Sequence, residues 1–120
     1  DGRSIETLGN YGGRVTSFEF LRKLKTIKRL WIKNNPKIEN LDFVEDLPNL
    51  ERIELLYLPK IVRLPKCDHL KKLKTIYAFE CNRLVDISEL KKLSGVKASA
   101  SGKSLQGRVY RTDDFSFSDN

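Results

Sequence analysis

The chain is poor in the residues on which catalysis and metal binding depend. Its 120 residues include one histidine, two cysteines, one tryptophan and no methionine. Catalysis by side chains needs a base, a nucleophile or a metal cluster placed together. His69 has no such neighbours in sequence, and Cys67 and Cys81 lack the spacing of zinc ligands. We therefore expect no enzyme activity, no catalytic residue, no metal site and no cofactor.

Several sorting and modification signals are also missing. No apolar run is long enough to cross a bilayer, and no signal-peptide pattern is present. The sequence contains no Asn-x-Ser/Thr glycosylation site. The Gly-Lys-Ser sequence at 102–104 lacks the upstream glycine of a phosphate loop, since that position is Lys97. Because the chain starts at Asp1 without a methionine, we expect a processed or trimmed product.

What the sequence does contain is a repeat. Three successive lines of 23 residues begin at Ile27, Leu50 and Leu73, and apolar residues recur at offsets 0, 3, 5, 11 and 14 in each line. A leucine occupies offset 20 in all three lines. Self-similarity at a fixed period of this length predicts a solenoid, in which each unit stacks on the next to complete a shared core.

The pattern L-x-x-L-x-L-x-x-(N/C)-x-x-L resembles that of the leucine-rich repeat family, over roughly residues 18–105. The resemblance implies an α/β fold, a short right-handed solenoid. It should have a curved parallel sheet of about four strands and an irregular, 3-10 or helical convex side. Asn35 and Cys81 match the family's turn position, where side chains bond backbone groups of neighbouring coils. Leu58 departs from the pattern, so we expect the middle repeat to interrupt that ladder.

The domain interpretation is a single leucine-rich-repeat domain over 1–120. Residues 1–26 form an N-terminal capping coil, in which Thr7 and Gly9 replace apolar residues. Three repeats, a degenerate C-terminal coil with small or polar residues at the strand offsets (Val96, Ser99 and Ser101), and a tail follow, over 27–49, 50–72, 73–95, 96–110 and 111–120. Val109 and Tyr110 are candidates to close the end of the solenoid, and Ser88 is a candidate helix cap.

Each repeat should supply one strand, at offsets 2 to 6, in which apolar residues point inward and variable residues point outward. The residues predicted to point inward are Leu30, Ile32, Ile53, Leu55, Ile76 and Ala78. Alternation then places the intervening side chains on the concave face. The candidate protein-binding residues there are Arg29, Trp31, Lys33, Arg52, Glu54, Leu56, Tyr57, Tyr77 and Phe79.

Trp, Tyr and Arg are enriched in binding hot spots, and an exposed aromatic patch on a small protein indicates an interaction site. The alternative is structural, with Trp31 covering the gap beside Gly9 and Asn10, and Phe79 packing on the tail. A net charge of +7 allows a second hypothesis. Basic residues cluster along one flank of the coils, with acidic Glu45, Asp46 and Glu51 between them. We interpret this flank mainly as solvated surface. The cations are Arg22, Lys23, Lys25, Lys28, Lys71, Lys72, Lys74, Lys91, Lys92 and Lys97.

The sequence thus predicts a non-catalytic, monomeric module that binds a protein partner through its concave face. Segments 47–61 and 81–84 resemble repeats of plant intracellular immune receptors, whereas 38–44 and 85–93 resemble internalin-type and toxin-immunity repeats. The resemblance implies host–microbe or toxin recognition, by a secreted effector, an immune-receptor fragment or an immunity protein. The alternative is an anion-binding protein that uses the basic flank on nucleic acid or acidic lipid. Because Cys67 and Cys81 lie at different offsets, we expect two free thiols and a reducing, intracellular site of action, reached after secretion if the chain is an effector.

Overall fold

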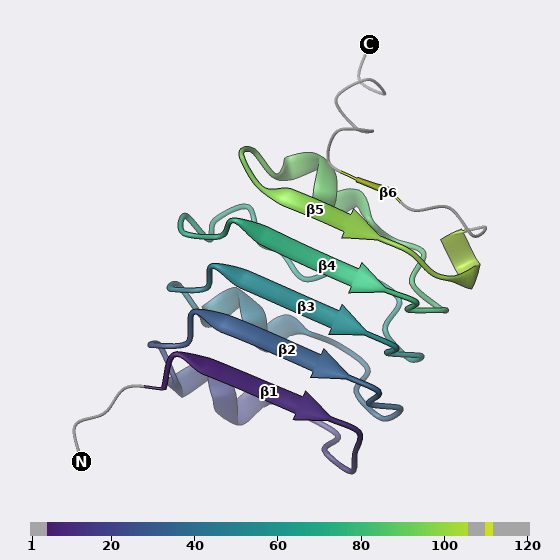
Figure 1. Ribbon diagram of the computed structural model, residues 1–120, viewed down its shortest axis with the longest axis horizontal. Coiled ribbons are helices and arrows are strands. Elements are labelled where there is room, and N and C mark those ends of the chain that lie inside the picture. The colour runs from purple at the N-terminus through teal and green to yellow at the C-terminus, as the bar shows by residue number, and fades with distance from the viewer. Residues whose placement is uncertain (1–4, 106–109, 112–120) are drawn as a thin grey trace.

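The fold is built on one sheet whose strands follow the order of the chain. The structure is a computed structural model, and it describes residues 5–105 and 110–111. Five neighbouring strands pair in parallel and a short sixth strand pairs antiparallel at the end (Figure 1). They are β1 (Thr7–Tyr11), β2 (Arg29–Lys33), β3 (Arg52–Leu56), β4 (Thr75–Phe79), β5 (Lys97–Ala100) and β6 (Tyr110–Arg111).

The three central strands occupy the predicted ranges. Alternation decides which face is buried, because successive side chains of a strand point to opposite sides. Leu30 pairs with Ile53, and Ile53 pairs with Ile76, so apolar side chains line up across the strands. All six residues predicted to point inward are buried, which confirms the parallel register of β2, β3 and β4.

The predicted register is wrong by one residue at both ends, and the predicted number of about four strands is too low. In β1, Leu8 pairs with Leu30, a separation of 22 residues. In β5, Ala98 pairs with Ile76, again a separation of 22. Ala98 and Ala100 therefore fill the inward positions that the 23-residue frame gave to Ser99 and Ser101. One deleted residue per crossover turns poor matches into ordinary strands.

Four short 3-10 helices complete the coils. They are η1 (Glu19–Lys23), η2 (Asp42–Asp46), η3 (Ser88–Lys92) and η4 (Lys103–Leu105). In Figure 1 the first three lie behind the sheet. These helices confirm the expectation of 3-10 turns on the side opposite the candidate site.

The starts of η1, η2 and η3 share one hydrogen-bond pattern. The side chain two positions before each helix accepts the N–H of its first residue: Ser17 for Glu19, Asn40 for Asp42 and Asp86 for Ser88. Ser88 is therefore not the cap that the sequence predicted. Its hydroxyl instead donates to Asp86, and these bonds lower the pKa of the Asp86 carboxyl.

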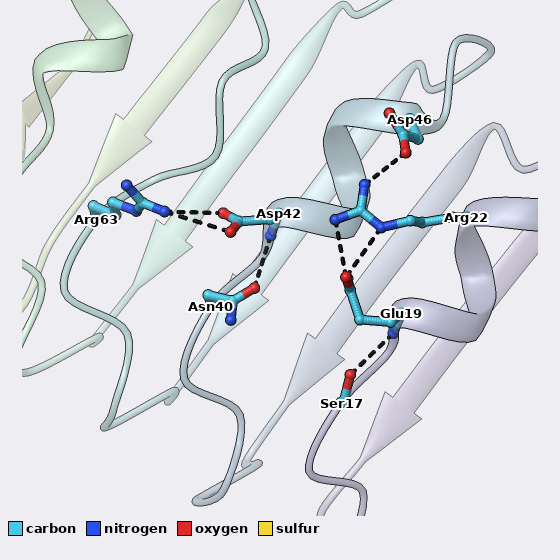
Figure 2. A network of polar contacts seen from close by, with 7 residues as sticks. All are labelled: Ser17, Glu19, Arg22, Asn40, Asp42, Asp46 and Arg63. Atoms are coloured by element: carbon cyan, nitrogen blue, oxygen red, sulfur yellow. Dashed lines mark hydrogen bonds and ion pairs between the residues drawn. The ribbon is translucent and has the colours of Figure 1, made fainter.

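The second repeat breaks this pattern, and no helix forms there. Arg63 stands at the accepting position but has no acceptor atom, and Pro65 has no N–H to donate. The Arg63 guanidinium instead reaches Asp42 of η2, at 3.2 and 3.4 Å (Figure 2). Arg22 similarly links η1 to η2 by bonding Asp46 at 2.6 Å (Figure 2). Side chains thus connect successive coils on the helical side.

The core lies between the sheet and these helices, and one polar side chain is fully buried in it. Asn35 Oδ1 accepts the N–H groups of Lys37 and Ile38, while its Nδ2 donates to the carbonyl of Val15. Asn35 therefore bonds its own turn and the preceding coil, as the turn position predicted. Leu58, at the equivalent position, is buried and carries no polar atom, so the ladder is interrupted there.

The helices of the described residues, all of five residues or fewer, are too short to cross a membrane. Of the predicted end-closing pair, Val109 lies outside the described residues, as do positions 112–120 of the predicted tail.

Candidate protein-recognition surface

The sheet has one face that the 3-10 helices do not cover, and it is turned toward the viewer in Figure 1. We call it the open face. It carries the outward side chains of β2 to β5, in rows that the parallel register aligns. They are Arg29, Trp31, Lys33, Arg52, Glu54, Leu56, Thr75, Tyr77, Phe79, Lys97 and Ser99.

Two exposed aromatic rings mark one side of the open face. The rings of Tyr57 and Phe79 meet edge to face, with centroids 5.6 Å apart and an interplanar angle of 85°. Tyr57 is 41% exposed and Phe79 is 46% exposed. Such a ring pair fixes both side chains in the free protein, so a partner that buries them loses little side-chain freedom.

A hollow of about 440 Å³ opens beside these rings. Its lining comes from three adjacent strands and the turn after β5. The lining residues are Glu54, Leu56, Tyr77, Ala78, Phe79, Ser99 and Ser101. Four of the predicted binding residues, Glu54, Leu56, Tyr77 and Phe79, are thereby brought together around one concavity. Depressions of this kind with apolar walls are where ligand groups bind.

Arg52 lies at the border of the hollow. Its guanidinium carbon is 5.4 Å from the centre of the Tyr77 ring, a cation–π distance. Its Nε donates to Glu54 Oε1 at 2.7 Å. Glu54 is therefore neutralised from within the protein, and the aromatic wall of the hollow is held beside a positive charge.

Trp31 is only half-buried, and its indole lies flat over Gly9 of β1. A Cβ atom built on Gly9 would stand 1.9 Å from the ring, so a larger residue at position 9 is excluded while the indole stays there. The structural alternative that the sequence allowed is thus correct in part. Trp31 covers the first strand and presents only its remaining surface to solvent.

Tyr11 is an open-face residue that the sequence interpretation missed. It ends β1, is 67% exposed, and lies in register with Lys33. The Lys33 ammonium is 5.6 Å from the centre of the Tyr11 ring. Counting back 22 residues from Lys33 rather than 23 would have found it, because that count also aligns Leu8 with Leu30.

The residue after each central strand has a left-handed backbone. Asn34, Tyr57 and Glu80 have φ angles of 56°, 56° and 53°. Asparagine tolerates this region well, but a bulky aromatic residue does so at a cost. The turn therefore holds Tyr57 in a strained conformation that keeps its ring beside Phe79.

The basic flank is extensively paired. Arg22 bonds both Glu19 and Asp46, and these bonds raise the pKa of its guanidinium. The ammonium of Lys25 donates to the carbonyl of Asp46. Lys72 donates to Asn49, and the ammonium of Lys92 lies 3.0 Å from Glu89. Cations that already bond protein oxygens have fewer donors to offer to phosphates.

The two cysteines are buried and unpaired. Burial raises the pKa of the Cys67 thiol to about 12 and that of Cys81 to about 11. His69, which is exposed, lies 2.7 Å from the carbonyl oxygen of Glu45. Within the described ranges, no three histidine, cysteine or acidic side chains are grouped so that they could hold a metal ion.

Comparison of the chain with protein-family models, with curated proteins and with solved structures found no significant match. The geometry of the open face is therefore what bears on function.

Proposed function

We propose that this chain is a short leucine-rich-repeat solenoid that binds a protein partner through the open face, without catalysis. The observation that carries the proposal is the cluster of Tyr57, Tyr77 and Phe79 around a hollow on adjacent strands. Exposed aromatic side chains held by a packed sheet are the residue type and the setting of interface hot spots.

The repeat pattern and the parallel register support the solenoid part of the proposal. Successive strands are 23 residues apart in the centre and 22 at the ends, and each crossover passes behind the sheet. Asn35 bonds the preceding coil from the turn position, as side chains there do in leucine-rich repeats. By resemblance, we place the module in host–microbe or toxin recognition, as an effector, a receptor fragment or an immunity protein.

A capture experiment with matched variants tests the proposal. The wild-type chain, Tyr77→Ala, and the double variant Lys71→Glu with Lys72→Glu serve as baits on extracts of the native source. We expect one protein to bind the wild-type chain and the lysine variant but not Tyr77→Ala. A partner that ignores Tyr77 and is lost with the lysines contradicts the proposal.

Ionic strength separates the proposal from anion binding. Binding to phosphates releases counterions, so its affinity falls steeply as salt rises. Binding centred on apolar aromatic surface is much less sensitive. A steep salt dependence of the captured complex, together with displacement by nucleic acid or acidic lipid vesicles, would favour the basic flank instead.

A further inference from the structure

The outward side chains of β2 to β5 are unbalanced in charge. They include four cations and one carboxylate: Arg29, Lys33, Arg52 and Lys97 against Glu54. The carboxylate is already bound by Arg52 at 2.7 Å. The open face is therefore positive, although the hollow within it has a mainly apolar wall.

The positive charges are ordered with respect to the hollow. Arg52, Thr75 and Lys97 are register neighbours and form a row at the beginning of their strands. Glu54, Tyr77 and Ser99 form the next outward row and line the hollow. Two residues along a strand separate the rows, which is about 6–7 Å. The hollow thus lies one outward row beyond a pair of cations.

We propose, resting on the protein-recognition function above, that the partner presents an acidic segment with one large apolar side chain. The apolar anchor enters the hollow beside Tyr77 and Phe79. A carboxylate two residues from the anchor lies over Arg52 and Lys97. An extended segment places residues i and i+2 on one side at the same 6–7 Å, so one strand-like peptide reaches both features.

Arg52 has donors left for this carboxylate. A guanidinium carries five N–H groups in a planar fork, and Glu54 engages the Nε and one terminal nitrogen. Stacking on Tyr77 keeps the guanidinium plane beside the hollow. Charge complementarity of this kind selects partners and raises association rates more than it adds affinity.

Four synthetic pentapeptides test the inference. The probe is acetyl-Asp-Ser-Phe-Ser-Asp-amide, which carries acids two residues on either side of its anchor. Its relatives replace both Asp by Asn, both Asp by Lys, or Phe by Ala. Titrations are followed by amide chemical shifts of the full chain. We expect the acidic Phe peptide to bind about tenfold more tightly than the Lys peptide, with shifts at Tyr77, Phe79 and Ser99.

Variants of the protein separate the two parts of the inference. Lys97→Glu should remove most of the preference for Asp over Lys, whereas Lys71→Glu, the same charge change at an exposed site off the open face, should keep it. Ser99→Leu fills the hollow without removing a core side chain, so the Phe and Ala peptides should then bind alike. Thermal unfolding of each variant confirms that it is folded.

Equal binding of the Asp and Lys peptides, shifts away from β3 to β5, or no binding of any of the four overturns the inference. Those outcomes leave the proposed function separately testable, because a natural partner lost with Tyr77→Ala would still use the open face. A natural partner that binds elsewhere, as shown by its indifference to Tyr77→Ala, overturns the proposed function whatever the peptides do.

Discussion

Tyr57 combines a strained backbone with an exposed ring, a combination that function rather than stability would favour. Tyr57→Asn relieves the left-handed backbone but removes the edge-to-face contact with Phe79, terms of about 1 kcal/mol each that oppose one another. We expect little change in unfolding free energy by denaturant titration and a clear loss of partner affinity.

Glu80→Asn is the matched control, because Glu80 has the same backbone conformation and makes no aromatic contact among those described. It should stabilise the protein by up to about 1 kcal/mol and leave binding intact. Equal losses of affinity in the two variants would show that the turn, and not the ring, matters.

Asn35 is the residue on which the turn of the first repeat depends. Asn35→Ala leaves the N–H groups of Lys37 and Ile38 without their acceptor in a buried place, and should cost about 2–3 kcal/mol of unfolding free energy. Asn40→Ala removes an exposed bond to Asp42 and should cost less than about 1 kcal/mol. Similar losses for both would mean that the Asn35 bonds are replaced by water.

The buried thiols give the protein a pH dependence in the alkaline range. Their folded pKa values, about 12 for Cys67 and about 11 for Cys81, exceed the ordinary value of 9.0. The unfolded chain therefore loses these protons first, and stability present below pH 9 is lost as pH rises toward 11 and 12.

The double variant Cys67→Ala with Cys81→Ala should be less stable but should have a flatter stability profile above pH 9. In the wild-type chain, alkylation of both thiols should follow global unfolding rather than local exposure. Rapid labelling of the native protein at neutral pH would contradict the burial of Cys67 and Cys81.

At the scale of elements, the contact between β1 and β2 depends on Gly9 lying under Trp31. Gly9→Ala must displace the indole, since the added Cβ would overlap the ring. As Trp31 is the only tryptophan, its fluorescence reports this directly. We expect emission to shift to longer wavelength in Gly9→Ala but not in Thr7→Ala, which alters the other open-face position of β1 nearest to it. An unchanged spectrum in both would show that the indole does not rest on Gly9.

The central strands were predictable from the sequence because their apolar residues repeat at a constant spacing. Ile53 and Leu55 alternate with outward residues and align with Leu30 and Ile32, so period and alternation agree. The end strands were misread because a crossover one residue shorter shifts every later side chain to the opposite face. Arg63 and Pro65 were likewise visible in the sequence, but the capping pattern that they break became clear only from the bonds of Asn40 and Asp86.

The candidate site was predictable in its residue types but not in its shape. Alternation placed Tyr77 and Phe79 on the open face, whereas the hollow depends on Ser99 being small and on the actual register of β5. The indole of Trp31 turned toward Gly9, a packing choice that depends on the first strand, whose register was misassigned. Trp31→Ala should therefore cost fold stability as well as binding, and is a poorer probe than Phe79.

At the scale of the whole molecule, the packed core and the coil-to-coil bonds lie on one side of the sheet and the exposed aromatic residues on the other. Phe79 and Val85 allow these sides to be compared, since both are exposed apolar residues, 46% and 59%, and only Phe79 lies on the open face. Their replacement by serine should change stability little. Their effects on binding should differ widely if the open face is the recognition surface.

The most direct measurement is a calorimetric titration of the captured partner with wild-type protein, Phe79→Ser and Val85→Ser. We expect Phe79→Ser to lose about 2 kcal/mol or more of binding free energy, the magnitude of a hot spot, and Val85→Ser to bind like the wild-type chain. If instead Val85→Ser loses the partner while Phe79→Ser binds normally, the open face is not the recognition surface.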